Sequence, residues 1–575
     1  MSIAEQTSRL SPAARDAARS RLGSETFDVI VVGGGITGAG VALDAASRGL
    51  SVALIEKRDF ASGTSSRSSK LIHGGLRYLE QRDFALVREA LHERALLLET
   101  LAPHLVESVP FLYPLRHKGW ERAYVGAGIG LYDALAGVHA ALPRHRHLSR
   151  SAALELAPAL RPDAMVGAIR YFDAQTDDAR FVVALLRTAV AGGAVALSGT
   201  RVEAIAGGDD GLRELRLRDT ERGEDLVARA RVVVNATGIW SGELERLAGV
   251  EQPVRVRASK GVHIIVPRER LDAEVALILR TERSVLLVIP WGAHWIVGTT
   301  DTEWNFDRDH PAASHADIRY LLDHVNAVLS RPLAEEDVVG VYVGLRPLVD
   351  RGDSDTTELS REHVVRRPAP GLVTVAGGKY TTYRVMARDA VDAAVLELDE
   401  EVDASRTDRL PLLGAEGLRT VRGRAFRDPL AARLGEPAIE HLLGRYGALV
   451  PVLLDLIRER PQLGRPIPGA GAYLMVEAVY AVEAEGARKL DDVLTRRTRI
   501  SIEAVDRGAA AAAPVAREIA GLLGWSEDDA DAEVDRYLRR LDAESAALRE
   551  PDDEHADAAR RSVRDPRLSP GRPGS

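Results

Sequence analysis

A strand–glycine–helix–strand segment near the N-terminus constrains the fold of this chain most. The apolar run Phe27–Val32 is typical of a buried strand, and the motif GGGITG at 33–38 turns it directly into a helix. Ser51–Ile55 reads as the next strand and is closed by Glu56. The glycines allow a tight turn, a close approach to a pyrophosphate and close helix packing, and the acid can bind ribose hydroxyls. The segment therefore predicts a dinucleotide site, without distinguishing FAD from NAD.

Composition narrows the chemistry further. The 575 residues include 76 lysines and arginines, 85 aspartates and glutamates, and no cysteine. The net charge of -9 argues against nucleic acid as the main partner. The absence of cysteine excludes disulfides, thiolate catalysis, thiolate zinc sites and cysteine-held iron–sulfur clusters, so redox chemistry has to come from a bound cofactor.

Changes in composition along the chain predict that it contains several domains and terminal segments. The nucleotide-binding domain is expected to be discontinuous, with a β-rich substrate domain inserted into it. A helical region follows it, and the charged, Pro/Gly/Ser-rich end is typical of disorder. The expected bounds are 1–26 for a flexible arm, 27–400 for the nucleotide domain, roughly 100–170 and 250–365 for the insert, 401–548 for the helical cap and 549–575 for a disordered tail. The sequence contains no uninterrupted run of 18 apolar residues, so a membrane-spanning helix is not expected.

A second strand–glycine–helix element occurs late in the nucleotide domain. Leu372–Ala376 reads as a buried strand, Gly377 and Gly378 follow it, and a helix is expected from about Thr381. Since this element repeats the chemistry of the first one, its helix N-terminus is expected to meet a second part of the same cofactor.

Several blocks together resemble the FAD-dependent glycerol-3-phosphate dehydrogenase family, the aerobic, membrane-associated type. The block SSRSSKLIHGGLRYLE at 65–80 is the most discriminating. The other matching blocks are the glycine motif, NATG at 235–238, KGVH at 260–263, GTTD at 298–301, GLRPL at 344–348 and GGKYTTYR at 377–384. The resemblance covers about residues 27–400; a less diagnostic match lies at 486–498. The sequence departs from the family pattern in the polar segment Asp307–His315 and in the long arm before Phe27.

The resemblance implies an α/β fold: a Rossmann-like FAD-binding domain of the glutathione-reductase or p-hydroxybenzoate-hydroxylase type, a β-rich substrate domain and an α-helical C-terminal domain. It implies oxidation of sn-glycerol 3-phosphate to dihydroxyacetone phosphate, with hydride transfer to flavin N5 and electrons passing to a membrane quinone. It also implies a cytoplasmic enzyme of glycerol metabolism, peripheral on the inner face of the cell membrane and without a metal. The oligomeric state stays open, with a homodimer as one option.

The residues expected to hold FAD come from four parts of the sequence. The glycine motif and Glu56 are expected to bind the ADP half, and the hydroxyl-rich loop and later glycines the rest. The set is Gly33, Gly34, Gly35, Ile36, Thr37, Gly38, Glu56, Thr64, Ser65, Ser66, Ser69, Lys70, His73, Gly74, Gly238, Gly378, Lys379 and Thr381. The hydroxyls of Thr64–Lys70 can instead cap the next helix.

Cationic residues within the matching blocks are candidates for the substrate's phosphate. Arginine suits a phosphate dianion, because its fork donates two parallel hydrogen bonds. Arg346, Arg77 and Arg361 are the first candidates, and Tyr78 and Lys260 are further substrate contacts. For each arginine, the alternative is a surface side chain paired with an acid.

Three residues are assigned catalytic roles. His263 is the first choice for accepting the hydroxyl proton, since imidazole titrates near neutral pH, and His73 is the second. Lys379 is expected to place a cation near the flavin or substrate, because a helix start does not favour lysine on its own account. Arg346 is expected to act in catalysis as well as in binding.

The long apolar segment Ala123–Leu142 allows two interpretations. A buried helix pair is favoured, because Asp133 and His139 interrupt the segment. The alternative is shallow insertion into a membrane, which suits a quinone acceptor that dissolves in the bilayer.

Two other functions remain open. One is a flavin oxidase that uses O₂ on glycerol 3-phosphate or a related substrate, including an amino acid. The other is a non-catalytic FAD-binding or membrane scaffold. The joint presence of Arg77, His263, Arg346 and Lys379 argues against the scaffold.

Overall fold

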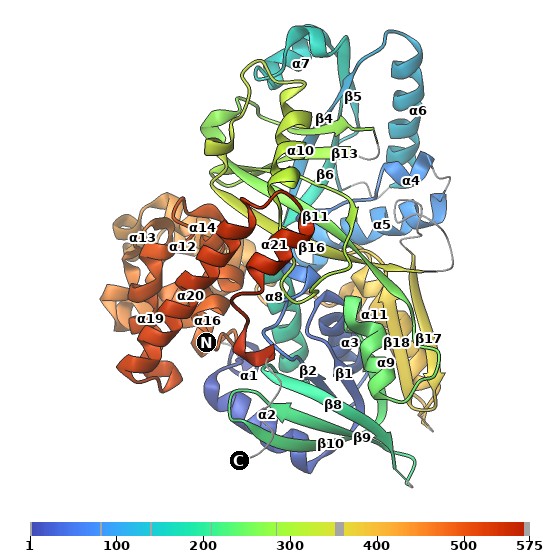
Figure 1. Ribbon diagram of the computed structural model, residues 1–575, viewed down its shortest axis with the longest axis vertical. Coiled ribbons are helices and arrows are strands. Elements are labelled where there is room, and N and C mark those ends of the chain that lie inside the picture. Colours follow the sequence, from blue (N-terminus) through green and yellow to red (C-terminus); the bar gives the residue numbers. More distant parts are fainter. Residues whose placement is uncertain are drawn as a thin grey trace.

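The computed structural model describes residues 3–80, 83–137, 141–208, 210–282, 285–350, 362–398 and 400–568. Two sheets form the body of the molecule, one in the lower half of Figure 1 and one in the upper half. A bundle of helices from the C-terminal part packs beside them, at the left of the same view. The architecture is the expected α/β fold with a β-rich second unit and a helical C-terminal domain.

The first sheet has a parallel core in the order β18-β10-β1-β2-β7, with β17 antiparallel at its edge. Strands β1 and β2 are buried almost throughout, as expected for apolar runs in a parallel sheet that is covered on both faces. Helices α3, α8 and α11 pack on one face, and β8 and β9 extend β10 as an antiparallel ribbon. The bounds are β1 Thr26–Val32, α3 Ile36–Ser47, β2 Val52–Ile55, α8 Asp178–Ala191, β7 Val195–Leu197, β8 Thr200–Gly207, β9 Arg213–Asp219, β10 Glu224–Asn235, α9 Ser241–Leu247, β17 His363–Ala369, β18 Leu372–Gly377 and α11 Tyr383–Val395.

The segment before β1 is a packed part of the fold, in contrast to the flexible arm that we expected. Helices α1 (Ile3–Thr7) and α2 (Pro12–Ser24) precede β1, and Leu22 of α2 belongs to the core under the first sheet. Arg15 is buried and forms an ion pair with Asp219 at 3.1 Å. The polar composition of this segment suggested a flexible arm, because its partners are distant in the sequence and meet it only in the folded chain.

The second sheet runs in the order β15-β11-β14-β13-β12-β4-β6-β3, with β16 on the other side of β11 and β5 beside β6. Helices α7 and α10 cover one face, while α6 and α18 contribute to the core on the other. The bounds are β3 Leu71–Ile72, α4 Arg77–Glu80, α5 Phe84–Leu96, β4 Val106–Leu115, α6 Trp120–Leu135, β5 Arg146–Ser149, α7 Arg150–Leu156, β6 Gly167–Thr176, β11 Val256–Pro267, β12 Ala276–Arg280, β13 Val285–Trp291, β14 His294–Gly298, β15 Thr302–Glu303, α10 His315–Asn326 and β16 Gly340–Val349.

The C-terminal helices have a core of their own. They join the first unit through buried ion pairs, among them Arg497–Asp59 at 2.7 Å and Arg499–Asp177 at 2.5 Å. Strands β19 and β20 form an antiparallel β-hairpin within this part. The bounds are α12 Leu418–Ala425, α13 Pro429–Leu434, α14 Glu436–Tyr446, α15 Val450–Glu459, β19 Pro466–Ile467, β20 Ala470–Leu474, α16 Met475–Glu483, α17 Leu490–Asp492, α18 Ile500–Glu503, α19 Ala509–Leu523 and α20 Glu527–Ala547.

Residues 549–568 are ordered, so the prediction of a disordered tail is wrong for this stretch. Helix α21 (Asp553–Arg560) crosses from the C-terminal bundle towards β11 and β16, and the chain then descends towards β8 (Figure 1). Ala556 is fully buried, and Arg567 pairs with Asp492 at 3.1 Å. The charged composition of this stretch is typical of disorder, but a charged residue such as Arg567 forms an ion pair with a buried partner here.

In the described residues of the apolar segment after β4 there is one helix, α6, so the prediction of a buried helix pair is wrong for them. Its outward residues Ala123, Tyr124, Ala127, Leu131 and Ala134 are all apolar. In the part of the chain that the structure describes, no helix is long and apolar enough to cross a bilayer.

Candidate functional site

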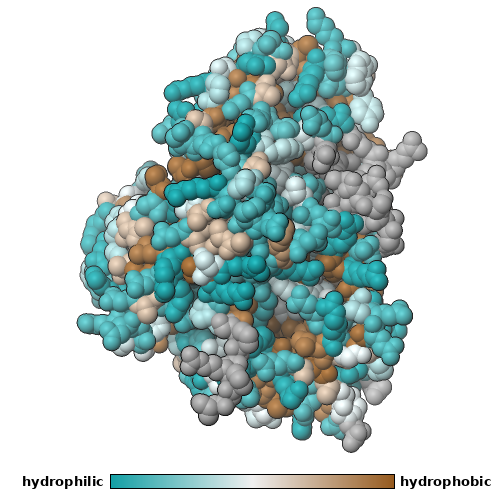
Figure 2. All heavy atoms as spheres, viewed as in Figure 1, coloured by the Kyte–Doolittle hydropathy of each residue, from teal (hydrophilic) through white to brown (hydrophobic). Residues whose placement is uncertain are grey.

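A cleft of about 430 Å³ lies between the two sheets. The carboxyl ends of the parallel strands β1, β2, β10 and β18 open into it, as ligand sites of such sheets do. Residues of β11 and β16 form the opposite wall. Figure 2 shows that most of one face of the molecule is hydrophilic, and that a broad hydrophobic area lies over the first sheet.

The glycine motif and Glu56 lie together at this cleft. Gly33, Gly34, Gly35, Ile36 and Thr37 all line it. The Glu56 carboxylate accepts hydrogen bonds from the backbone N–H groups of Gly34 and Arg58, each at 2.8 Å, which fixes its orientation. Gly38 does not line the cleft. A Cβ there would collide with the carbonyl oxygen of Gly33, so this glycine serves helix packing.

The hydroxyl-rich loop after β2 divides into lining and supporting residues. Thr64, Ser65 and Ser69 line the cleft, and the Ser65 hydroxyl accepts a hydrogen bond from the N–H of Ile36 at 2.9 Å. Ser66 is buried outside the cleft. Lys70 is fully buried and pairs with Asp178 at 2.8 Å, so its ammonium is committed inside the protein rather than to a cofactor.

The HGG segment meets the second glycine element directly. His73 lines the cleft, and its N–H donates to the hydroxyl of Thr381 at 3.1 Å. The N–H of Gly74 donates to the hydroxyl of Tyr132 at 2.8 Å. Thr381 and Gly74 do not line the cleft themselves, so they hold His73 in place.

Gly238, Gly378 and Lys379 line the cleft from the ends of β10 and β18. The ammonium of Lys379 lies 3.6 Å from the centre of the Tyr78 ring, and Tyr78 lines the cleft too. The late glycine element therefore reaches the same space as the first one, as we expected from its repeated pattern.

His263 of β11 lines the cleft with a fixed ring. Its Nε2 lies 2.8 Å from the Ser69 hydroxyl, and its ring stacks on Tyr342 with centroids 4.7 Å apart. Burial, followed by the charges of Arg346 and Lys70, holds the pKa of His263 well below its usual range. The imidazole is therefore neutral at physiological pH and has a lone pair for a proton.

Arg346 of β16 lines the cleft beside His263. It donates to the hydroxyls of Ser259 at 3.1 Å and Thr299 at 3.0 Å, and lies 3.3 Å from the Asp301 carboxylate. A Cβ on Gly261 would come within 2.6 Å of this guanidinium and of the Thr299 hydroxyl, so glycine leaves room for both groups in this arrangement. These contacts orient a partly exposed cation towards the open space.

One other predicted substrate residue, Lys260, does not line the cleft. Lys260 is fully buried and pairs with Asp317 at 2.6 Å, and its odd spacing from His263 puts it on the opposite face of β11. We therefore withdraw it as a substrate contact. Arg361 and the side chain of Arg77 lie outside the described residues.

Sequence reasoning missed several parts of the site. Trp240 lines the cleft near the glycine motif, with the Lys57 ammonium 4.1 Å from the centre of its ring. Tyr342, on which the His263 ring stacks, lies outside the recognised sequence blocks. Asp301 and Thr299 belong to the GTTD block, so that block already contained the residues that orient Arg346.

The cleft fits FAD on structural grounds. Five residues of the glycine motif border this space, and so do Gly378 and Lys379 of the later glycine element. A neutral imidazole and an oriented arginine border it as well. Such an arrangement can hold a dinucleotide in extended form and present a substrate anion and a proton acceptor to its reactive ring.

Comparisons with known proteins agree with this geometry. Residues 28–392 match the family described as FAD dependent oxidoreductase, and residues 405–530 match the C-terminal domain of alpha-glycerophosphate oxidase.

Named relatives cover nearly the whole chain. It is 52% identical over 554 residues to glycerol-3-phosphate dehydrogenase 2 of Mycobacterium tuberculosis, covering 96% of this chain and 94% of the relative. It is 35% identical to the mitochondrial glycerol-3-phosphate dehydrogenase of Bos taurus, covering 94% of this chain and 76% of the relative. A solved glycerol-3-phosphate dehydrogenase from Bacillus halodurans, complexed with FAD, aligns with a TM-score of 0.75 at 29% identity, covering 93% of this chain and 97% of that one.

Proposed function

Because this chain belongs to the FAD-dependent oxidoreductase family that includes the glycerol-3-phosphate dehydrogenases, we propose that it oxidises sn-glycerol 3-phosphate to dihydroxyacetone phosphate. Family membership and the FAD cofactor, both expected from the sequence blocks, are confirmed. The substrate is proposed from the names of the relatives and from the chemistry of the cleft.

One observation supports the proposal most strongly: an oriented arginine and a neutral histidine lie side by side in the cofactor cleft. Arg346 binds the phosphate dianion in this proposal, and its anchoring by Asp301 and Thr299 limits the entropy lost on binding. His263 accepts the proton of the substrate's secondary hydroxyl at its Nε2, where Ser69 now lies.

Bound FAD supplies the acceptor for the hydride from the carbon that carries this hydroxyl. The protein's part is to place that carbon and to remove the proton. Loss of one hydride and one proton converts the alcohol to the ketone. Lys379 adds a cation near the reacting end of the cleft, and Arg77, Tyr78 and Arg361 remain proposed contacts of the substrate.

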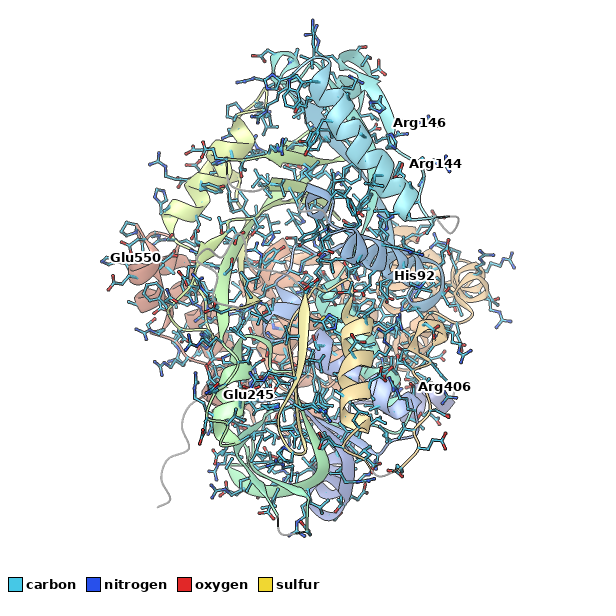
Figure 3. All side chains as sticks on the ribbon, turned by 90° about the vertical axis from the view of Figure 1, so that its right-hand side faces the viewer. His92, Arg144, Arg146, Glu245, Arg406 and Glu550 are labelled. Atoms are coloured by element: carbon cyan, nitrogen blue, oxygen red, sulfur yellow. The ribbon has the colours of Figure 1, made fainter. Side chains whose placement is uncertain are left out.

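We further propose that the enzyme works at the cytoplasmic surface of the cell membrane and passes its electrons to a quinone. Helix α6 supports this proposal. Trp120, Tyr124 and Leu131 of its outer face are 64%, 55% and 40% exposed, although such side chains are usually covered. Figure 3 shows Arg144 and Arg146 beside α6, pointing away from the body of the protein. Aromatic and apolar residues flanked by cations suit an anionic lipid surface.

A turnover assay tests the function. Purified enzyme is given glycerol 3-phosphate and a water-soluble quinone analogue under argon, and dihydroxyacetone phosphate and quinol are measured. We expect the two products in equal amounts. Absence of dihydroxyacetone phosphate would reject the substrate. Formation of peroxide in air, at the rate of quinone-dependent turnover, would identify an O₂-using oxidase instead.

A further inference from the structure

A second cavity, of about 70 Å³, lies where the loop after β2 meets α20, α21 and the end of the chain. A cavity of this size holds several water molecules or one oxyanion. Its lining contains nine lysines and arginines but only three carboxylates. Arg58 and Arg67 come from the loop after β2, Arg540 from α20, and Arg560 and Arg564 from the ordered tail.

Some of these cations are neutralised within the protein. Arg540 and Arg560 both pair with Glu544, at 2.8 and 3.3 Å, and Arg567 pairs with Asp565 at 2.9 Å. Arg507 pairs with Glu544 as well, so this carboxylate is shared among three arginines, and Arg540 also pairs with Asp491. The carboxylates near the cavity are therefore already paired with Arg540, Arg560 and Arg567.

Arg58 and Arg67 are different. Among the described residues, no carboxylate lies within ion-pair distance of either. Arg58 is buried, and its guanidinium donates only to the carbonyl oxygens of Asp309 at 3.1 Å and Ser62 at 3.5 Å. The guanidinium of Arg67 has no hydrogen-bond acceptor among the described residues, although it borders the cavity.

The surroundings of Arg67 carry an unbalanced positive field. Burial and, after it, the charges of Arg58, Arg540 and Arg496 together lower the pKa of Arg67 to about 9. Burial and the charges of Arg560, Arg58 and Arg67 also lower the pKa of His310, which borders the same cavity. An anion in the cavity would compensate these charges.

We propose that this cavity binds a phosphate-sized oxyanion, free or as the phosphate group of a small metabolite, between Arg58 and Arg67 on one side and Arg540, Arg560 and Arg564 on the other. Guanidinium groups bind such anions by paired charge-assisted hydrogen bonds. The anion would join the loop of the cofactor domain to α20 and α21. This site is separate from the substrate's phosphate at Arg346, and it does not depend on the proposed reaction.

Equilibrium dialysis of the FAD-loaded enzyme against radiolabelled orthophosphate tests the site. The Arg346→Ala variant is used throughout, so that phosphate at the proposed substrate site does not contribute. We expect one phosphate per chain. Arg564→Glu, at an exposed residue of the cavity mouth, should weaken its binding about tenfold or more, because an attractive charge becomes a repulsive one. Arg549→Glu makes the same charge change at an exposed residue outside the cavity and is the matched control.

Arg67→Gln, measured with its flavin content, completes the test, because Arg67 also borders the cofactor cleft. We expect weaker phosphate binding with full flavin content. Three results would each overturn the proposal: no phosphate bound in the Arg346→Ala background, equal effects of Arg564→Glu and Arg549→Glu, or loss of flavin from Arg67→Gln with unchanged phosphate affinity.

Discussion

The hydroxyl of Ser69 lies 2.8 Å from Nε2 of His263, and this contact joins the loop after β2 to the second sheet. The two residues are separated by 194 positions in the sequence. Ser69 belongs to the loop proposed to bind the cofactor, and His263 is the proposed proton acceptor. The contact therefore sets the position of the acceptor relative to the cofactor before any substrate binds.

Replacing the imidazole tests this role. His263→Asn should lower kcat by about 100- to 10,000-fold, which is the usual contribution of a general base. The flavin content should stay at the wild-type level, because His263 lies on the substrate side of the cleft. Ser69→Ala should have a much smaller effect on kcat, since the stacking of His263 on Tyr342 remains. Equal losses in both variants would mean that the pair is structural.

Removing the proposed phosphate ligand should affect substrate affinity. Arg346→Ala should raise KM for glycerol 3-phosphate about 10- to 150-fold, the equivalent of a charge-assisted hydrogen bond of roughly 1.5–3 kcal/mol. Flavin content and absorbance spectrum should be unchanged. A variant that loses flavin but keeps a normal KM would show that Arg346 serves the cofactor.

The same residue should control the pH dependence of turnover. Burial first, and then the Arg346 charge, hold the pKa of His263 down, so the histidine stays unprotonated and able to accept a proton below pH 6.5. In Arg346→Ala this repulsion is lost, the pKa of His263 rises, and the acid limb of kcat/KM should move to higher pH. Arg346→Lys keeps the charge and should keep the wild-type limb. An unchanged limb in Arg346→Ala would contradict the coupling.

Gly38 offers a test of the packing of α3. Gly38→Ala would push a methyl group into the carbonyl oxygen of Gly33, so it should destabilise the protein by about 1–3 kcal/mol and lower its affinity for FAD. Gly128→Ala, in α6, meets no atom within 4 Å and should instead stabilise the protein by about 0.5–1 kcal/mol. Thermal unfolding with and without FAD measures both. Equal melting temperatures for the two variants would refute this explanation.

Binding to lipid vesicles tests the surface of α6. Trp120→Glu and Tyr124→Glu should strongly reduce co-sedimentation with anionic vesicles, because each puts a charge into the proposed contact. Leu396→Glu makes the same change at a side chain that is 70% exposed elsewhere on the surface, and it should have no effect. If Leu396→Glu reduces binding as much as Trp120→Glu does, α6 is not the contact surface.

Local patterns in the sequence were sufficient to predict the first sheet and the cofactor-binding elements, because strand, glycine and helix follow one another within a few residues. They were not sufficient to predict contacts between residues that are distant in the sequence. Lys70 and Lys260 read as ligands but are buried in ion pairs with Asp178 and Asp317. The tail after residue 548 reads as disordered, yet Arg567 pairs with Asp492, which is far away in the sequence. Which side chains of α6 face outward could be determined only from their exposure in the structure.

Anaerobic reduction of the flavin tests the central claim most directly. The enzyme is mixed rapidly with either glycerol 3-phosphate or glycerol under argon, and the flavin absorbance is followed in the wild type and in Arg346→Ala. The proposed site predicts fast bleaching by glycerol 3-phosphate only, and loss of this preference in Arg346→Ala. No bleaching at saturating glycerol 3-phosphate, or equal bleaching by glycerol in the wild type, would contradict it.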